Sequence, residues 1–185
     1  MNFDNVIKAR KTIRKYKDLE VSNEDIISII KSAILAPSAK NRQPWRFYIL
    51  NDKEKDDIVN MMLDWEQKNK GFGSSIKGSA NQMCQASTAI VVYSPIYHSK
   101  NKKTHYKKPD YLSLGAAIEN MALKCSDLGL GSSWLCDTLY IEDEINDYLN
   151  IDDLEQISTL VIGYPKEIPS RRERLSIDEV ILNKN

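Results

Sequence analysis

The chain has 185 residues, enough for one domain with a substantial buried core. Its 26 basic and 26 acidic residues balance, which argues against nucleic acid or an anionic membrane as a main partner. No stretch approaches the roughly 18 apolar residues of a membrane span, and the first residues lack a signal-peptide pattern. The three cysteines contain no C-x-x-C pair. We therefore expect reduced thiols, no metal site and a cytoplasmic location.

The first half of the chain predicts a helix, a strand and a second helix. Ser22 has the form of a hydroxyl cap with an acid, Asp25, three residues later, and isoleucines at helical spacing follow until Pro37. Residues 45–50 form an apolar run that indicates a strand. Residues 51–70 alternate charged and apolar side chains as an amphipathic helix does, and the glycines after them break the pattern.

The second half mixes strands and helices without a strict βαβ repeat. Residues 88–93 are short, apolar and β-branched, which indicates a buried strand. Residues 94–110 are polar, basic and too irregular to predict. The clearest helical stripe runs over 111–125, ended by Gly129 and Gly131, and further elements are expected at 132–135 (strand), 142–149 (helix) and 157–164 (strand). We predict an α+β fold in which helices cover a mostly antiparallel or mixed sheet.

Two short polar stretches carry the strongest functional signal. Residues 10–14 read Arg-Lys-Thr-Ile-Arg, and residues 36–45 read Ala-Pro-Ser-Ala-Lys-Asn-Arg-Gln-Pro-Trp. Each places cations, hydroxyls or amides beside the end of an element, where backbone N–H groups are exposed. This combination suits a phosphorylated, flat ligand with polar edges.

Residues for acid–base or nucleophilic catalysis are poorly represented. The two histidines, His98 and His105, have no Ser or Cys partner nearby in the sequence, and no Walker loop, G-x-G-x-x-G or H-E-x-x-H motif occurs. A bound cofactor is therefore the natural carrier of the chemistry. Trp45 and Trp134 are expected in the core and not against a cofactor.

An ordered set of motifs across residues 6–180 resembles the nitroreductase family of flavin mononucleotide (FMN) oxidoreductases. The motifs are Arg10-Lys11-Thr12-Ile13-Arg14, then Pro37-Ser38 with Asn41 and Gln43-Pro44-Trp45, then Gly115-Ala116-Ala117-Ile118-Glu119-Asn120, Gly129-Leu130-Gly131-Ser132, Gly163-Tyr164-Pro165 and Arg171-Arg172-Glu173-Arg174. Each motif alone is weak, and the ordered set is specific. Two positions depart from the family pattern: Ser113 stands where an acid is frequent, and Glu119 where a glutamine is usual.

The resemblance implies which residues bind FMN. Its phosphate would meet residues from both ends of the chain, and the other contacts would come from Arg14 at the pyrimidine edge, from Gly131 in the turn, and from a loop of the second subunit. The implied residues are Arg10, Lys11, Thr12, Arg172 and Arg174 for the phosphate, and Pro37, Ser38, Asn41 and Gln43 for the loop. The alternatives from the residues alone are a solvated helix end for 10–14, a satisfied turn for Ser38 and Asn41, and a surface charge run for 171–174.

The resemblance also implies an activity for a single domain over 1–185. The expected reaction is hydride transfer from NAD(P)H to FMN and then, by a ping-pong mechanism, to a nitroaromatic, a quinone or a similar flat acceptor, in a homodimer. A variable segment around 64–78 would cover the substrate, and the basic excursion at 94–110 is either a solvated loop or an attractor of anions such as NADPH phosphates. The alternatives are a flavin sensor or store without turnover, and reductive dehalogenation or flavin cleavage on the same fold.

Overall fold

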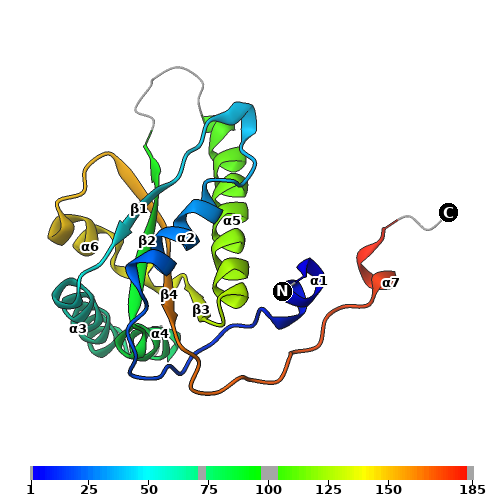
Figure 1. Cartoon of the computed structure of the whole chain (residues 1–185). Helices are drawn as coiled ribbons and strands as arrows, with labels where there is room; N and C mark the ends of the chain where they lie inside the picture. The colour runs from blue at the N-terminus through cyan, green and yellow to red at the C-terminus, as the bar shows by residue number, and fades with distance from the viewer. Residues whose placement is uncertain (1, 71–73, 97–103, 183–185) are drawn as a thin grey trace.

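The computed structural model describes the backbone of residues 2–70, 74–96 and 104–182, and the side chains of the same residues except 74 and 104–106. Within these residues four strands form one sheet in the order β1-β2-β4-β3. They are β1 (Arg46–Ile49), β2 (Thr88–Pro95), β3 (Gly131–Leu135) and β4 (Leu154–Gly163), all paired antiparallel. Helices lie on both faces of this sheet (Figure 1), so the predicted α+β class is confirmed.

The sheet separates two hydrophobic cores, and the strand β2 contributes to both. Its residues alternate: Ile90 and Val92 join the core formed with α2 (Asn23–Ala33) and α5 (Thr104–Asp127), whereas Val91 joins the other. The second core is completed by α3 (Asp52–Lys68), α4 (Ser74–Gln85) and α6 (Glu142–Leu149). Residues 88–94 are buried throughout, which explains why their sequence reads as a continuous apolar run instead of an alternating one.

Most predicted elements are present, but the residue patterns missed three helices, at Phe3–Ala9, Ser74–Gln85 and Ile177–Val180, and left one region unassigned. The Ser22 hydroxyl caps α2 by accepting a hydrogen bond from the Asp25 amide at 3.1 Å, and α6 covers 142–149 as expected. The helix α4 was not predicted, because its buried stripe is short and interrupted by polar residues and a glycine. The region 94–110 was left unassigned, yet β2 continues to Pro95 and α5 already begins at Thr104.

The segment after α1 (Phe3–Ala9) runs along the ends of β3 and β4 as an additional backbone partner. Thr12 forms a parallel bridge with Ser132, and the Ile13 amide donates to the Ser132 carbonyl at 2.9 Å. Further on, Tyr16 bridges Pro165. These hydrogen bonds attach residues 12–16 both to the start of β3 and to the chain that leaves β4.

The last residues form an arm that extends away from the body made by the sheet and its helices (Figure 1). It is exposed from 171 to 182 and carries a short helix, α7 (Ile177–Val180). Its large apolar side chains face solvent in the single chain, among them Leu175, Ile177 and Leu182. Of the helices described, none combines the length and the apolar character needed to cross a bilayer.

Substituting Gly131 tests how closely the segment after α1 packs on β3. A Cβ atom at this position would lie 2.5 Å from Cγ1 and 2.7 Å from Cβ of Ile13, a residue that is only 4% exposed. We expect Gly131→Ala to lower the free energy of unfolding by about 1–3 kcal/mol through overpacking. Urea unfolding of the apoprotein measures the loss.

Gly78→Ala is the matched control, because Gly78 lies inside α4 and a Cβ atom there would meet nothing within 4 Å. This variant should be neutral or more stable by up to about 1 kcal/mol, the helix propensity difference. Equal stability of the two variants would contradict the packing argument.

Candidate functional site

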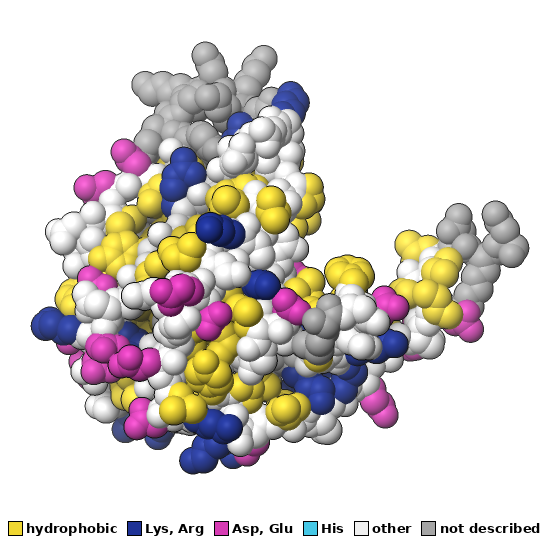
Figure 2. Space-filling model, viewed as in Figure 1, with side chains coloured by type: hydrophobic (Ala, Val, Ile, Leu, Met, Phe, Trp, Pro, Cys, Tyr) yellow, Lys and Arg dark blue, Asp and Glu magenta, His cyan; other side chains and the backbone are white. Residues whose placement is uncertain are grey.

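Two segments from opposite ends of the sequence line one hollow of about 410 Å³. Arg10, Lys11, Thr12 and Arg14 contribute from the front, and Pro169, Ser170, Arg171, Arg172 and Arg174 contribute from the chain that follows β4. Six of these nine residues, all within the described part of the chain, are Lys or Arg. Figure 2 shows dark blue side chains grouped below α1, where the arm leaves the body. We call this hollow the basic pocket.

The basic pocket has the donors that a phosphate group needs. Guanidinium groups donate paired, charge-assisted hydrogen bonds to phosphate oxygens, and the Thr12 hydroxyl adds a neutral donor. The whole chain carries no net charge, so the clustering of cations here is local. Such a cluster concentrates anions at the site and increases their association rate.

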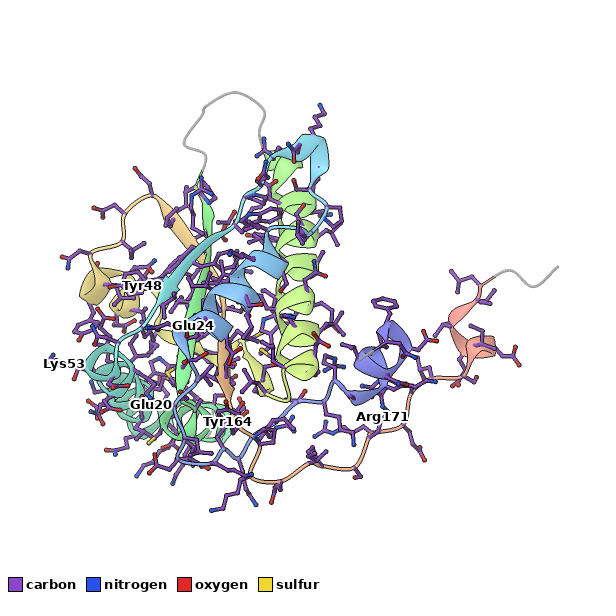
Figure 3. The ribbon with its side chains drawn as sticks, in the orientation of Figure 1. Glu20, Glu24, Tyr48, Lys53, Tyr164 and Arg171 are labelled. Carbon is purple, nitrogen blue, oxygen red and sulfur yellow. The ribbon has the colours of Figure 1, made fainter. Side chains whose placement is uncertain are left out.

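Arg171 connects the arm to α1, a role that the sequence did not reveal. Its Nη2 donates to the backbone oxygens of Ile7 at 3.0 Å and Lys8 at 2.7 Å, near the carboxyl end of that helix (Figure 3). A cation at this end also interacts favourably with the partial negative charge of the helix dipole. Arg171 therefore holds the two halves of the basic pocket together, while the neighbouring Arg172 and Arg174 remain exposed.

Glu119 on α5 places a negative charge at the edge of the basic pocket. Its Oε1 lies 3.2 Å from Nε of Arg10, and the two side chains are 49% and 24% exposed. This is the position where the sequence departs from the family pattern by having Glu in place of Gln. The carboxylate competes with any bound anion for Arg10.

The loop at 37–43 lines a different hollow, of about 420 Å³, which we call the loop groove. Pro37, Ser38 and Ala39 form one wall of it, and the other wall is α5, with Pro109, Leu112, Ser113 and Ala116. None of the described residues lines both hollows. The two sets of predicted FMN contacts thus remain apart in a single chain, the loop lying toward the beginning of α5 and α1 beside its end (Figure 1).

Polar groups of the loop are bonded to one another. The Ser38 hydroxyl accepts a hydrogen bond from the Gln43 amide at 3.1 Å, and Nε2 of Gln43 donates to Oδ1 of Asn41 at 3.3 Å. Asn41 and Gln43 are exposed. Ser38 therefore satisfies a backbone group of the turn in the single chain, whereas Asn41 contacts a neighbouring side chain, and the predicted contact of both with FMN stays a prediction.

Three other predicted positions have defined places. Gly131 is buried beneath Ile13 and does not line the basic pocket, so its place beside FMN stays a prediction. Trp45 is buried in the α2–α5 core as expected. The prediction for Trp134 was wrong: it is 43% exposed, because β3 is an edge strand and directs this ring toward Gly115 of α5.

Parts of two predicted regions lie outside the described residues. In the segment 64–78 these are residues 71–73, while Trp65 before them stacks on Tyr140 with ring centroids 4.8 Å apart. In the basic excursion they are residues 97–103 and the side chains of 104–106. Lys107 beyond them pairs with Glu155 at 2.9 Å. The described part of the chain contains no group of three or more His, Cys, Asp or Glu side chains that could hold a metal ion.

Comparisons with known proteins agree with the motifs. The model of the nitroreductase family matches residues 7–164. A provisionally named NADH dehydrogenase/NAD(P)H nitroreductase of Archaeoglobus fulgidus is 34% identical over 88% of this chain and 84% of its own length. Among solved structures, a provisionally named nitroreductase of Desulfovibrio desulfuricans in complex with FMN has a TM-score of 0.81 at 25% identity, covering 100% of this chain and 98% of the other. A BluB-like flavoprotein of Clostridium difficile has a TM-score of 0.82 at 26% identity over the whole of both chains. The chain belongs to the nitroreductase family.

Proposed function

We propose that this protein is an FMN-dependent oxidoreductase that takes hydride from NAD(P)H and reduces a nitroaromatic, a quinone or a similar flat acceptor by a ping-pong mechanism. Membership of the family and the names of the relatives support the redox chemistry. The observation that carries the proposal is the basic pocket, because backbone pairing assembles it from the two distant segments that the motifs had linked to the FMN phosphate.

The residues present fit FMN. A phosphate dianion would be held in the basic pocket by Arg10, Lys11 and Thr12 from the front and by Arg172 and Arg174 from the arm. Arg14 lines the same pocket and would stand at the pyrimidine edge of the flavin, where a cation favours the reduced, negatively charged form. One charge-assisted hydrogen bond of about 1.5–3 kcal/mol would raise a two-electron potential by roughly 30–60 mV. When bound, FMN supplies the hydride acceptor and donor, so no protein acid or base is needed at that step.

We also propose a homodimer in which the loop at 37–43 reaches the FMN of the second chain. One face of α5 supports this, because Pro109, Leu112 and Ala116 follow each other at helical spacing and Leu112 is 76% exposed. The arm supports it too, since the apolar side chains of Ile177, Val180 and Leu182 are 54% to 100% exposed in the single chain. Patches of this kind are typical of surfaces that bury themselves against a partner.

The expected cytoplasmic location is retained as part of the proposal. All three cysteines are free thiols, which suits a reducing compartment. Burial raises the pKa of Cys125 to about 12, so this thiol stays protonated and is not a nucleophile.

Anaerobic mixing of the FMN-loaded protein with NADH and, separately, with NADPH tests the proposal. We expect the yellow flavin to bleach within seconds and to recover its colour when a nitroaromatic or quinone is added, with parallel lines in double-reciprocal kinetics. Flavin that binds but never bleaches would instead indicate a sensor or a store. Release of halide from a halogenated aromatic, or loss of FMN in air, would indicate the other two chemistries.

Arg174→Ala tests the contribution of the arm to the basic pocket. Loss of one charge-assisted hydrogen bond should weaken FMN binding by about 1.5–3 kcal/mol, measured by titrating the apoprotein with FMN. Lys31→Ala is the control, because it removes one positive charge from the exposed last turn of α2, and Lys31 lines neither the basic pocket nor the loop groove. Unchanged affinity in Arg174→Ala would exclude this side chain from the phosphate contacts.

Glu119→Gln tests the competition for Arg10. Without the carboxylate, Arg10 is free to bind the phosphate, and an exposed ion pair of this kind is worth about 0.5–1 kcal/mol, so FMN should bind about two- to fivefold more tightly. Glu24→Gln on α2 makes the same charge change away from the basic pocket and should leave the affinity unchanged (Figure 3). Weaker binding by Glu119→Gln would mean that the pair positions Arg10 instead of competing for it.

A further inference from the structure

A buried ion pair joins the loop at 37–43 to α5. Arg42 and Asp110 meet with both donors of one guanidinium edge, Nε to Oδ1 at 2.9 Å and Nη2 to Oδ2 at 2.8 Å. The Asp110 side chain is only 2% exposed and that of Arg42 is 20% exposed. This planar two-bond geometry fixes orientation as well as distance, which a lysine could not do.

The loop that this pair anchors has an unusual backbone. Lys40, Asn41 and Gln43 have φ values of 54°, 53° and 48°, in the left-handed region that residues with a side chain seldom adopt. Arg42 stands among them with φ −72° and ψ −26°, an ordinary helical conformation. The three left-handed residues are exposed, so packing of their side chains does not impose the conformation. A backbone conformation of this kind persists only where the surrounding interactions impose it. Residues in such conformations cluster at functional sites.

The ion pair also connects the two walls of the loop groove. Ser38 and Ala39 lie on one wall, and Pro109, the neighbour of Asp110, lies on the other with Ser113. Arg42 follows the first wall in the sequence, and Asp110 belongs to the second. The distance between the walls therefore depends on two short charge-assisted contacts.

A buried ion pair is weak evidence for a gain in stability, because removing two charges from water offsets most of their attraction. The better-supported role of such a pair is to fix the relative position of the two segments that it joins. We propose that Arg42 and Asp110 are positioning residues, which hold the loop at 37–43 in its left-handed shape so that it can contact the FMN of the partner chain. This inference rests on the proposed function, and in particular on the dimer.

The central experiment replaces the pair by apolar residues in the full-length protein. Arg42→Met/Asp110→Leu removes both charges of the pair together, so neither of the two is left in the interior without the other, and the variant is expected to fold. Arg42→Lys keeps the charge but loses the two-bond geometry. The control Lys53→Met/Asp57→Leu removes an ion pair of 2.7 Å from α3, where Lys53 is 81% exposed. For each variant we measure FMN affinity, the visible circular dichroism of the bound flavin, its midpoint potential, the dimer content and urea unfolding.

The apolar double variant should remain a folded dimer, bind FMN at least tenfold more weakly and alter the visible dichroism of the flavin. Arg42→Lys should lose affinity as well, and adding Lys40→Gly to it should restore part of the loss, because glycine adopts a φ of 54° without steric cost. The α3 control should match the wild type in FMN affinity, visible dichroism, midpoint potential and dimer content. Its urea unfolding registers a loss of its own, because Asp57 also accepts a hydrogen bond from the Tyr148 hydroxyl.

Two results would overturn the inference: wild-type FMN affinity and dichroism in the folded apolar variant, or the same loss in the α3 control. If the apolar variant fails to fold, Arg42→Lys provides the test. Wild-type FMN affinity and dichroism in Arg42→Lys would then reject the positioning role of the pair. The proposed function is judged separately, by whether the wild-type protein bleaches with NAD(P)H. A wild type that binds FMN without turnover would reject that function and leave the comparison of FMN affinities valid.

Discussion

The candidate site depends on the backbone pairing between residues 12–16 and the ends of β3 and β4. The hydrogen bond from the Ile13 amide to Ser132 and the bridge from Tyr16 to Pro165 hold the front of the chain beside the segment that becomes the arm. This approach is possible because Gly131 has no side chain where Ile13 packs. Together with the bonds from Arg171 to α1, this pairing brings the cations at 10–14 and at 171–174 into one pocket.

Bringing six cations together is unfavourable for a protein without a bound anion, since like charges repel. Two features reduce this cost in the single chain. Arg171 is bound to the carbonyl groups of Ile7 and Lys8, and Arg10 is paired with Glu119. The bonds of Arg171 to the backbone fix the shape of the pocket. The Arg10–Glu119 pair, in contrast, is exposed, so a bound anion can replace Glu119 as the partner of Arg10. The pocket therefore combines one arginine that holds its two segments together with another that can change its ionic partner.

The sequence was most informative where the physics is local. A cap and helical spacing predicted α2, helical spacing predicted α3 and most of α5, and short apolar runs predicted β1 and β2, because each of these signals lies within a few residues. The linear order of motifs predicted the pairing of 10–14 with 171–174 by resemblance, although no local signal relates them. The Arg42–Asp110 pair and the bond from Arg171 to α1 could not be predicted. The partners are 68 residues apart in the first and more than 160 in the second, and no local sequence pattern marks any of them. Trp134 was misplaced because an aromatic residue in a strand reads as core unless the strand is known to be at the edge.

In the proposed dimer the cofactor would be bound by residues of two chains, and binding and association would then be linked. Each FMN would contact the basic pocket of one chain and the loop at 37–43 of the other. By thermodynamic reciprocity, FMN would strengthen dimerisation by the same factor by which dimerisation strengthens FMN binding. The shape of the loop determines how large that factor is, because a loop already held in its bound conformation loses little entropy on contact. The Arg42–Asp110 pair thus acts on the loop, the part of the site that would contribute to FMN binding only in the dimer. The residues of the basic pocket, in contrast, all come from a single chain.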